Sequence, residues 1–502
     1  MDPICSPTGY ILRDFLISLD RNASKSLQAQ LREVLVSAIL AGHLRPGDKL
    51  PSTRHLSRQL GISRNTSVLV YQGLTDDGYL RTSERSGYFV NETVLEMGVH
   101  SSVGTQTSIV SDGDAQPIDW TSRLLKHPAG QRNIHKPRDW QSLPYPFIYG
   151  QPDQSLFPIT DWRDCVYKAM GKRWLDEWSQ DTLDNDDPML IDQIRTRILP
   201  RRGILVGEDQ ILVTLGAQQA LYTLASLLVG PETRIVVEEP GYPDARNIFA
   251  LRSEYIVPVQ VDGDGLPVGE ELKSAELVYV TPSHQLPTTV TMTDARRRAL
   301  LKTAREREFV IIEDDYELES NYVGKPLPAL KSLDQDGRVI YVGSFSKTLF
   351  PGLRLGFVVA SAELIHEMRA LRRLMVRHPP TNNQRSTAFF LSLGYYDVFV
   401  RRLHRSYRQR WSAMGAALAQ HFPDADMVQG MGGSSYWVNL GDSSAVDTDQ
   451  LARRALKEGI LIEPGSVYFG SADNRSCFRL GFSSIEAQKI DAGLELLARM
   501  TK

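Results

Sequence analysis

Apolar residues near the start of the chain recur at the spacing of one helix face. Across residues 26–40 the periodic apolar positions are Leu27, Leu31, Val34, Leu35, Ala38 and Ile39. This pattern predicts an amphipathic helix with one buried side. The stretch that follows, "AGHLRPGDKLPSTR", holds glycines and prolines that end the helix.

Two more helical segments and a pair of strands follow this first helix. Ser52 is a suitable N-cap for a helix over "TRHLSRQLG", which Gly61 ends. A third helix begins near Ser63, in "SRNTSVLVYQGLTDDG". After Gly78, "YLRTSERSGYFV" predicts two short strands joined by a Ser/Gly turn. Together these elements predict a winged helix-turn-helix. Its recognition helix, the third helix here, would place its N-terminal residues in the major groove of DNA.

Polar residues around the start of the third helix have the chemistry needed to contact DNA. Arg64 and Asn65 suit base edges, whereas Arg54, Ser63 and Thr66 suit phosphate oxygens. The string "LRPGDKLPSTRHLSRQLGISRNTSVLVYQGLTDDGYL…SGYFV" closely resembles the GntR-type winged helix over its whole length. The DNA-facing positions that this resemblance implies are Arg54, Ser63, Arg64, Thr66 and Gly87.

The rest of the chain changes character twice. Residues 93–143 are mostly polar and aperiodic, which predicts a flexible linker between domains at residues 20–92 and 144–502. From residue 144 onward, apolar β-branched runs alternate with longer helical stretches. The clearest runs are "QILVTLG", "RIVVEEPG", "ELVYVTP", "FVIIEDD" and "RVIYVGS". This alternation predicts parallel crossovers and an α/β fold built on a mostly parallel sheet.

Composition and charge are consistent with a multidomain DNA-binding protein. The 502 residues exceed one compact core, and 42% hydrophobic with 23% charged residues is ordinary for a globular chain. Residues 1–90 hold 11 Lys and Arg against 8 Asp and Glu, a charge of +3, so the remainder carries −6 and the whole chain −3. A mildly basic first domain permits DNA binding by that domain alone.

The sequence also excludes several other classes of protein. Three scattered cysteines lack metal-ligand spacing, and the N-terminal residues "MDPICSPTGY" do not form a secretory signal. No apolar stretch is long enough to span a bilayer. We therefore expect a cytoplasmic protein with no metal site.

A lysine at the end of a predicted buried strand is the main candidate for chemistry in the second domain. The segment "SFSK" (Ser344–Lys347) follows "RVIYVG", and a lysine is costly to bury. Upstream, "FVIIEDDYELE" ends a strand in acids and a tyrosine, and "VTLGAQQAL" leads into a helix N-terminus that can bind an anion. "VEEPGYPDAR" places an aromatic residue just past a Pro-Gly turn.

In this order the motifs resemble fold-type I aminotransferases, which bind pyridoxal 5'-phosphate, over about residues 145–500. The resemblance implies that Lys347 forms a Schiff base with the cofactor and that Asp314 keeps the pyridine nitrogen protonated. It implies that Tyr316 hydrogen-bonds the ring hydroxyl and that Tyr242 stacks on the ring. The phosphate ligands that it implies are Ser344, Arg354, Gly216, Ala217 and Gln218. In "CFRLGF", Arg479 matches the fork for a substrate carboxylate.

Two of these assignments stay open at the level of sequence. Asp314 matches the acid by its distance along the chain to Tyr316 and Lys347, and Asp315 is the alternative. His284, in "VTPSHQLPTT", occupies a position near the cofactor in related proteins, and it can equally serve to orient a loop.

The order of both halves resembles the MocR/GabR regulators over nearly the whole chain. That family implies a homodimer in which each DNA-binding domain packs near the partner's body, with an amino-compound effector that activates or represses promoters. The effector would displace Lys347 and form an external aldimine, while Arg479 holds its anionic group. The alternatives are an active aminotransferase and a direct sensor of pyridoxal phosphate that controls its synthesis.

Two positions depart from the aminotransferase pattern. "LDNDDPML" lacks the tyrosine that usually donates to the phosphate of the partner subunit, and "LPTT" places Thr289 where glycine is typical. We expect both changes to impair turnover more than cofactor binding, because one neutral hydrogen bond contributes only about 0.5–1.5 kcal/mol.

Overall fold

Residues 1–119 and 120–502 form two separate structural units in the computed structural model of the chain. The structure describes residues 10–12, 15–17, 19–21, 23, 25–83, 87–92, 118–148, 152–181, 185–317, 319–428, 430–441, 446–471 and 475–501. The first part of the predicted linker, residues 93–117, lies outside these ranges. Within the described ranges, no helix combines the length and apolar character needed to cross a membrane.

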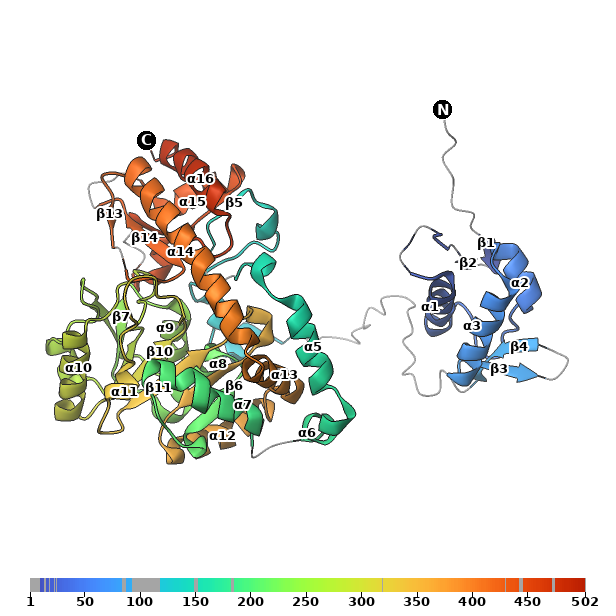
Figure 1. Ribbon diagram of the computed structural model, residues 1–502, viewed down its shortest axis with the longest axis horizontal. Coiled ribbons are helices and arrows are strands. Elements are labelled where there is room, and N and C mark those ends of the chain that lie inside the picture. Colours follow the sequence, from blue (N-terminus) through green and yellow to red (C-terminus); the bar gives the residue numbers. More distant parts are fainter. Residues whose placement is uncertain are drawn as a thin grey trace. The chain divides into compact units, whose positions relative to one another are not determined.

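Three helices and a hairpin make up most of the N-terminal unit (Figure 1). The elements are β1 (Tyr10–Leu12), β2 (Phe15–Ile17), α1 (Leu27–Leu40), α2 (Thr53–Leu60), α3 (Arg64–Asp76), β3 (Leu80–Ser83) and β4 (Gly87–Val90). The helix cap predicted at Ser52 is confirmed, and Ser63 caps the third helix in the same way. The Ser52 hydroxyl accepts from the His55 amide at 3.2 Å, and the Ser63 hydroxyl accepts from the Thr66 amide at 3.0 Å. Gly61 ends α2 with a φ of +62°, a left-handed conformation that favours glycine.

Side chains from all three helices bury against this hairpin. Leu31 of α1, Leu56 of α2 and Leu74 of α3 are fully buried in one cluster with Val90 of β4. Tyr71 joins them, and its hydroxyl donates to the Pro51 carbonyl at 3.0 Å. The predicted winged helix-turn-helix is confirmed, while the turn between the two strands, residues 84–86, lies outside the described residues.

A seven-stranded sheet forms the middle layer of the second unit. In spatial order its strands are β6 (Ile211–Thr214), β12 (Gly356–Val359), β11 (Val339–Ser344), β10 (Val310–Asp315), β9 (Leu277–Val280), β7 (Ile235–Glu239) and β8 (Ile256–Gln260). Neighbouring strands are parallel except at β12, which is antiparallel to both β11 and β6. The five strands predicted from apolar runs are confirmed as β6, β7, β9, β10 and β11.

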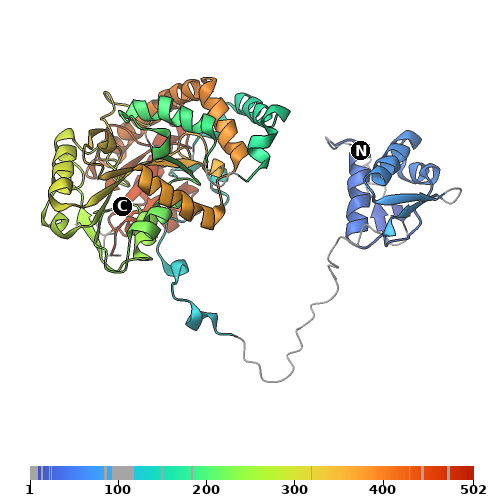
Figure 2. The same ribbon diagram turned by 90° about the horizontal axis from the view of Figure 1, so that it is seen from below.

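Helices cover both faces of this sheet, because alternate side chains of each strand point to opposite sides. One face packs Val237 and Ile312 against α8 (Ala217–Leu228), α9 (Pro243–Ala250) and α12 (Ala362–Val376). The other face packs Val236 and Ile311 against α10 (Asp294–Arg307) and α11 (Leu330–Leu333). Figures 1 and 2 show the resulting three layers. The carboxyl ends of the parallel strands meet at one edge, where the loops that follow them gather.

A smaller antiparallel sheet lies toward the C-terminus. Its strand order is β13 (Asp426–Met427), β14 (Ser435–Asn439), β17 (Cys477–Gly481) and β16 (Glu463–Pro464). Nearby, β15 (Ile460–Leu461) pairs in parallel with β5 (Tyr145–Pro146). The remaining helices are α4 (Trp120–Arg123), α5 (Ile159–Ala169), α6 (Leu175–Ser179), α7 (Pro188–Gln193), α13 (Thr381–Ser392), α14 (Tyr395–His421), α15 (Thr448–Lys457) and α16 (Ala487–Arg499).

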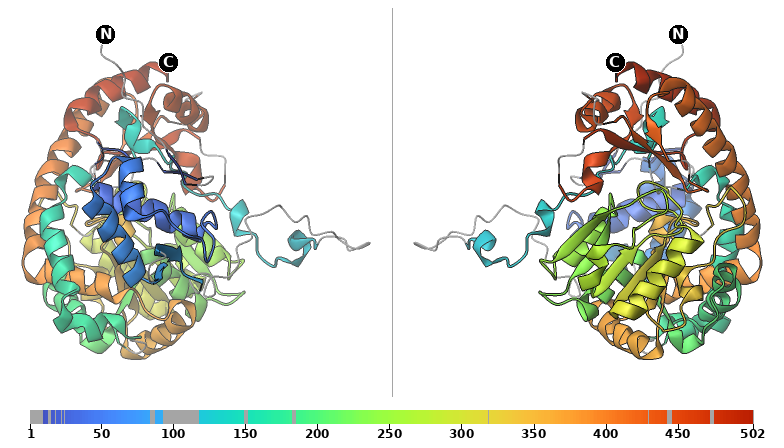
Figure 3. Two further views of the ribbon diagram at one scale, coloured as in Figure 1. Left: turned by 90° about the vertical axis from the view of Figure 1, so that its right-hand side faces the viewer. Right: turned by 90° about the vertical axis from the view of Figure 1, so that its left-hand side faces the viewer.

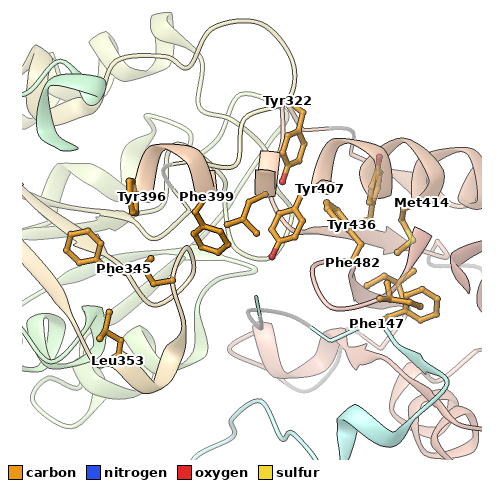
Figure 4. Close-up of a cluster of buried hydrophobic side chains, with 14 of the residues drawn as sticks. Phe147, Tyr322, Phe345, Leu353, Tyr396, Phe399, Tyr407, Met414, Tyr436 and Phe482 are labelled. Carbon is orange, nitrogen blue, oxygen red and sulfur yellow. The ribbon is translucent and has the colours of Figure 1, made fainter. Parts of the chain in front are cut away.

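The long helix α14 joins the two sheet regions (Figures 1 and 3). Its first turns pack near the large sheet, where the ring centroids of Tyr396 and Phe345 lie 6.5 Å apart. Farther along, the ring of Tyr407 lies 6.4 Å from that of Phe482, and Met414 belongs to the same buried cluster. Figure 4 shows this cluster as one continuous set of side chains. One apolar cluster therefore extends through both regions.

Candidate functional site

The two acids at the end of β10 point to opposite sides, as the pleat of a strand requires. Asp314 lines a cavity at the carboxyl ends of the parallel strands, where it accepts a hydrogen bond from the Tyr279 hydroxyl at 2.8 Å. Asp315 instead accepts from Arg202 Nε at 2.7 Å and from the Tyr341 hydroxyl at 2.8 Å. Of the two alternatives that the sequence left open, the structure brings Asp314 to the cavity.

One oxygen of the Asp314 carboxyl has no hydrogen-bond partner among the described residues. This oxygen is the buried Oδ1, whereas Oδ2 is bonded to Tyr279. Burial, together with the nearby charge of Asp315, raises the pKa of Asp314 to about 7, although the Tyr279 hydroxyl and the cation of Lys347 oppose the shift. Such a carboxyl is able to share a proton with a basic ring nitrogen placed against it.

Lys347 follows β11 and its amine lines the same cavity. Burial and the positive charge of Lys136 lower the pKa of Lys347 to about 7, more than the nearby acids raise it. About half of such amines are neutral at pH 7, and the neutral amine is the nucleophilic form. Lys347 is therefore a buried amine whose nucleophilicity is raised.

One end of the cavity is built to bind an anion. Helix α8 begins at Ala217 after Gly216, whose φ of +86° suits glycine, so its first amide groups face the cavity. A Cβ on Gly216 would meet the guanidinium of Arg354 at 3.3 Å. Ser344 also lines this end, and the buried Ser346 hydroxyl beside it has no hydrogen-bond partner among the described residues. The structure thus gathers the predicted phosphate ligands Ser344, Arg354, Ala217 and Gln218 here.

Two tyrosines line the remaining wall. Tyr242 precedes α9, and its hydroxyl donates to Asp244 at 3.0 Å; Gln218 Nε2 donates to the same carboxyl at 2.6 Å. The Tyr316 hydroxyl donates to the main-chain oxygen of His284 at 2.9 Å.

The side chain of His284 does not line this cavity; it lies in a separate small cavity with Arg202. Burial lowers the pKa of His284 to about 4, so the ring is neutral at pH 7.

Arg479 lies beyond the cavity wall, on β17. It is fully buried, and its guanidinium donates to the Ser435 hydroxyl at 2.8 Å and to the Tyr468 hydroxyl at 3.4 Å. Glu463 lies opposite Arg479 in the register of β16 and β17. The charge of Arg479 reaches the cavity, because it lowers the pKa of both Lys347 and Lys136.

The predicted DNA-contacting residues lie on the surface of the N-terminal unit. Arg64 and Asn65 are exposed in the first turn of α3, and Arg54 is exposed in α2. Ser63 is the N-cap of α3 and Thr66 accompanies it in that turn, with their hydroxyl oxygens 2.8 Å apart. Gly87 begins β4 with a φ of +108°, which disfavours any other residue. Their contacts with DNA stay predictions.

Comparison with known proteins identifies both halves of the chain. Residues 27–90 match bacterial regulatory proteins of the gntR family, and residues 183–497 match aminotransferase class I and II. The HTH-type transcriptional regulator TauR of Rhodobacter capsulatus is 42% identical over 94% of this chain and 96% of its own. The probable rhizopine catabolism regulatory protein MocR of Rhizobium meliloti is 31% identical over 96% of this chain and 95% of its own. The chain belongs to the MocR-type transcription regulators.

Solved structures similar to this MocR-type regulator are aminotransferases. Kynurenine aminotransferase of Pyrococcus horikoshii matches with a TM-score of 0.69 and 28% identity, over 76% of this chain and 97% of its own. LysN, the α-aminoadipate aminotransferase of Thermus thermophilus, matches with a TM-score of 0.69 and 26% identity, over 76% of this chain and 98% of its own. The protein is therefore a DNA-binding transcription regulator with a pyridoxal-phosphate-dependent aminotransferase-like domain.

The cavity of this regulator fits its cofactor, pyridoxal phosphate. The unpartnered Oδ1 of Asp314 suits the pyridine nitrogen, and the amine of Lys347 suits the aldehyde. The N-terminus of α8 with Arg354 suits the phosphate dianion, for which the unpartnered hydroxyl of Ser346 offers one more donor. Tyr242 and Tyr316, which also line the cavity, would contact the ring of the cofactor.

Sequence reasoning missed six of the residues that line this cavity, among them Tyr279, Ser346 and Lys136. Tyr279 belongs to an apolar strand pattern, and only the pairing of β9 with β10 brings its hydroxyl to Asp314. Ser346 directly precedes Lys347 in "SFSK", and this adjacency is the sequence signal that could have identified it. Lys136 falls in the segment predicted as linker, and the structure places it in the cavity wall.

Thr289, the threonine at the usual glycine position, adopts a φ of +64° and is buried. A β-branched residue is rarely found there, and the strain costs on the order of 1–3 kcal/mol. The turn thus has the left-handed backbone conformation that favours glycine, although the residue there is threonine. The other departure, "LDNDDPML", falls partly on residues 182–184, outside the described ranges.

Proposed function

We propose that a small amino compound binds in the cavity at Lys347 and thereby switches DNA binding by the N-terminal unit. One observation carries this proposal: a buried lysine whose pKa is lowered to about 7 occurs in a chain that also has a gntR-family DNA-binding domain. An amine of that kind is nucleophilic at physiological pH, and another amine can replace it.

The cofactor supplies an aldehyde that condenses reversibly with amines, so Lys347 and the effector compete for the same carbon. Asp314 would hold a proton at the pyridine nitrogen through its unpartnered oxygen, Oδ1. Tyr242 and Tyr316 would orient the ring. Once released, Lys347 can accept the proton that the incoming amine gives up, because its pKa is close to 7. Arg479 is the candidate to bind an anionic group of the effector.

The switch requires that the effector bind two arrangements of the protein with different affinity. We propose that these are arrangements of a homodimer, in which each DNA-binding unit packs near the partner's body. The resemblance to MocR/GabR regulators supports this assembly, and a dimer would match DNA sites made of two half-sites. A regulator of promoters would act in the cytoplasm.

Replacing the amine tests this proposal directly. We expect Lys347→Ala to lose the visible absorbance band of the lysine-bound cofactor and the effector response of DNA affinity, while retaining DNA binding. Lys325→Ala, at an exposed lysine of the same domain, serves as the matched control. Fluorescence anisotropy with promoter DNA and absorbance spectra measure both effects. A Lys347→Ala protein that still responds fully to effector would contradict the proposed coupling.

Turnover as an aminotransferase is the second candidate. The observation that favours it is the presence of Lys347, Asp314 and Arg479 together, in a fold shared with solved aminotransferases. Sustained formation of a keto acid and a new amino acid from an amino donor and an acceptor would establish it. A single conversion that stops after one equivalent of cofactor would favour the regulatory function.

Direct sensing of the cofactor is the third candidate. It is supported by a relative in Corynebacterium glutamicum, 29% identical over 94% of this chain, that is named as a pyridoxine biosynthesis regulator. In that case, adding pyridoxal phosphate to the apo-protein would change DNA affinity with no amine present.

A further inference from the structure

Each of the two acids at the end of β10 is bonded to one buried tyrosine from a neighbouring strand. Tyr279 of β9 pairs in register with the residue two positions before Asp314, and its hydroxyl donates to Asp314 Oδ2 at 2.8 Å. Tyr341 of β11 pairs with the residue two positions before Asp315 and donates to Asp315 Oδ2 at 2.8 Å. The two contacts are thus equivalent on opposite faces of the sheet, and Tyr279 is the tyrosine that lines the cofactor cavity.

The packing around Tyr279 fixes the direction of its hydroxyl. The side chain is 2% exposed, and its ring meets that of Phe249 on α9 edge to face, with the centroids 5.8 Å apart. Burial and the charge of Asp314 raise the pKa of Tyr279 well above its usual value, so the hydroxyl keeps its proton. Tyr279 is therefore a permanent and well-oriented hydrogen-bond donor to Asp314.

This donor decides both the orientation and the charge of the Asp314 carboxyl. Among the described residues, the Tyr279 hydroxyl gives the one hydrogen bond to that carboxyl, and it engages Oδ2 and leaves Oδ1. The bond favours the carboxylate, whereas burial favours the neutral acid. The difference matters for a basic ring nitrogen at Oδ1, because a carboxylate lets the proton stay on the ring and a neutral acid keeps the proton for itself.

We propose that Tyr279 is a positioning residue for the cofactor, whose hydroxyl holds Asp314 as a carboxylate with Oδ1 turned toward the pyridine nitrogen. Tyr279 acts through Asp314, so its effect depends on the ring having a nitrogen that can carry a proton. The inference concerns the cofactor and not the effector, and it is therefore independent of the proposed function.

A deaza analogue of pyridoxal phosphate, in which a carbon replaces the ring nitrogen, tests this role. Apo-protein is titrated with each compound in a calorimeter, and the ratio of the two affinities is the readout. We expect wild-type protein to prefer pyridoxal phosphate. Tyr279→Phe, which removes only the hydroxyl, should reduce this preference about threefold to tenfold, because a hydrogen bond to a charged group is stronger than one to a neutral group. The analogue offers the carboxylate no proton, so its binding should not weaken.

Tyr341→Phe is the matched control, because it removes an equally long hydrogen bond from a buried acid on the other face. It should keep the wild-type preference. Asp314→Asn should abolish most of the preference, and adding Tyr279→Phe to Asp314→Asn should change the ratio no further, because the two residues act as one unit. Both compounds are titrated into the same protein, so partial unfolding of a variant lowers both affinities alike and leaves their ratio unchanged.

Three results would overturn the inference. The first is a Tyr279→Phe protein with the wild-type preference. The second is an equal fall in Tyr341→Phe, which would show that the loss of any buried hydroxyl at β10 has this effect. The third is a further fall when Tyr279→Phe is added to Asp314→Asn, since Tyr279 would then act on the ring without Asp314. None of these results bears on the response of DNA binding to an effector, which the Lys347→Ala experiment tests separately.

Discussion

Arg202 and Asp315 form an ion pair of 2.7 Å in which both side chains are almost completely buried, at 4% and 0% exposure. The pair turns Asp315 away from the cofactor cavity and leaves that cavity to Asp314. Burial alone would raise the pKa of Asp315, but the charge of Arg202 and the hydroxyl of Tyr341 outweigh it and hold the pKa below its usual value. The ion pair therefore has a structural role, and the charge of Asp315 also helps to raise the pKa of Asp314 on the other side of the strand.

Asp315→Asn should destabilise the second unit. Removing one partner of a buried ion pair leaves an uncompensated charge and costs about 3–5 kcal/mol. Because the pKa of Asp315 is lowered by folding, its contribution is present above pH of about 4 and is lost as the pH falls through the lowered pKa. Urea unfolding followed by tryptophan fluorescence measures the loss. Asp336→Asn, at an exposed acid, is the control, and equal midpoints for the two variants would contradict the prediction.

Asp314→Asn should weaken cofactor binding with little effect on stability. The amide cannot hold a charge-assisted hydrogen bond to the pyridinium, a loss of about 1.5–3 kcal/mol, or roughly ten- to a hundredfold in affinity. Titration of the apo-protein with pyridoxal phosphate, followed by absorbance, measures the affinity. An unchanged affinity in Asp314→Asn would exclude the proposed contact with the ring nitrogen.

The amine of Lys347 should titrate near pH 7 in the apo-protein. Its folded pKa of about 7 lies below the usual value for lysine, so the neutral amine is the minor form at pH 6 and the major form at pH 8. Trace acetylation with acetic anhydride, read by mass spectrometry, should therefore rise about tenfold between these two values and then level off. Acetylation of Lys347 that keeps rising steeply above pH 8 would show that its pKa is not lowered.

Arg64→Gln should weaken DNA binding and leave folding unchanged. The side chain is exposed at the start of α3, so the core of the N-terminal unit does not depend on it. Loss of a base contact costs about 1–3 kcal/mol of binding free energy and relaxes sequence preference at one position. Anisotropy with an operator selected from random-sequence DNA measures the change. Lys302→Gln, exposed on α10, should bind like wild type.

The order of elements and most of the cavity could be predicted because they follow from local patterns. Apolar runs gave β10 and β11, and motifs at their ends placed Asp314 and Lys347 at one edge of the sheet. The direction of each strand in the sheet could not be predicted in this way. β12 lies antiparallel in a mostly parallel sheet, and no local pattern distinguishes the direction of a short apolar strand. The choice between Asp314 and Asp315 likewise depended on which face of the sheet each one meets.

Contacts between distant segments set the limit of prediction. Lys136 lies in a polar, aperiodic stretch. Its neighbours Gln131 and Arg132 are held by hydrogen bonds to Asn247, more than a hundred positions away. His284 follows a strand that ends at the cavity, yet its main-chain oxygen is the group that meets Tyr316. Sequence proximity to a site therefore did not settle which atoms reach it.

Asp244 accepts hydrogen bonds from Gln218, Tyr242 and Asn133, which belong to three separate stretches of chain. An excised body that starts at residue 144, where the sequence pattern begins to alternate, would lack the third donor and Lys136 with it. Such a fragment would keep every strand of its sheet and still have an incomplete pocket. A fragment with a complete pocket must therefore begin earlier, within the segment that the hydrophobic pattern alone assigns to the linker.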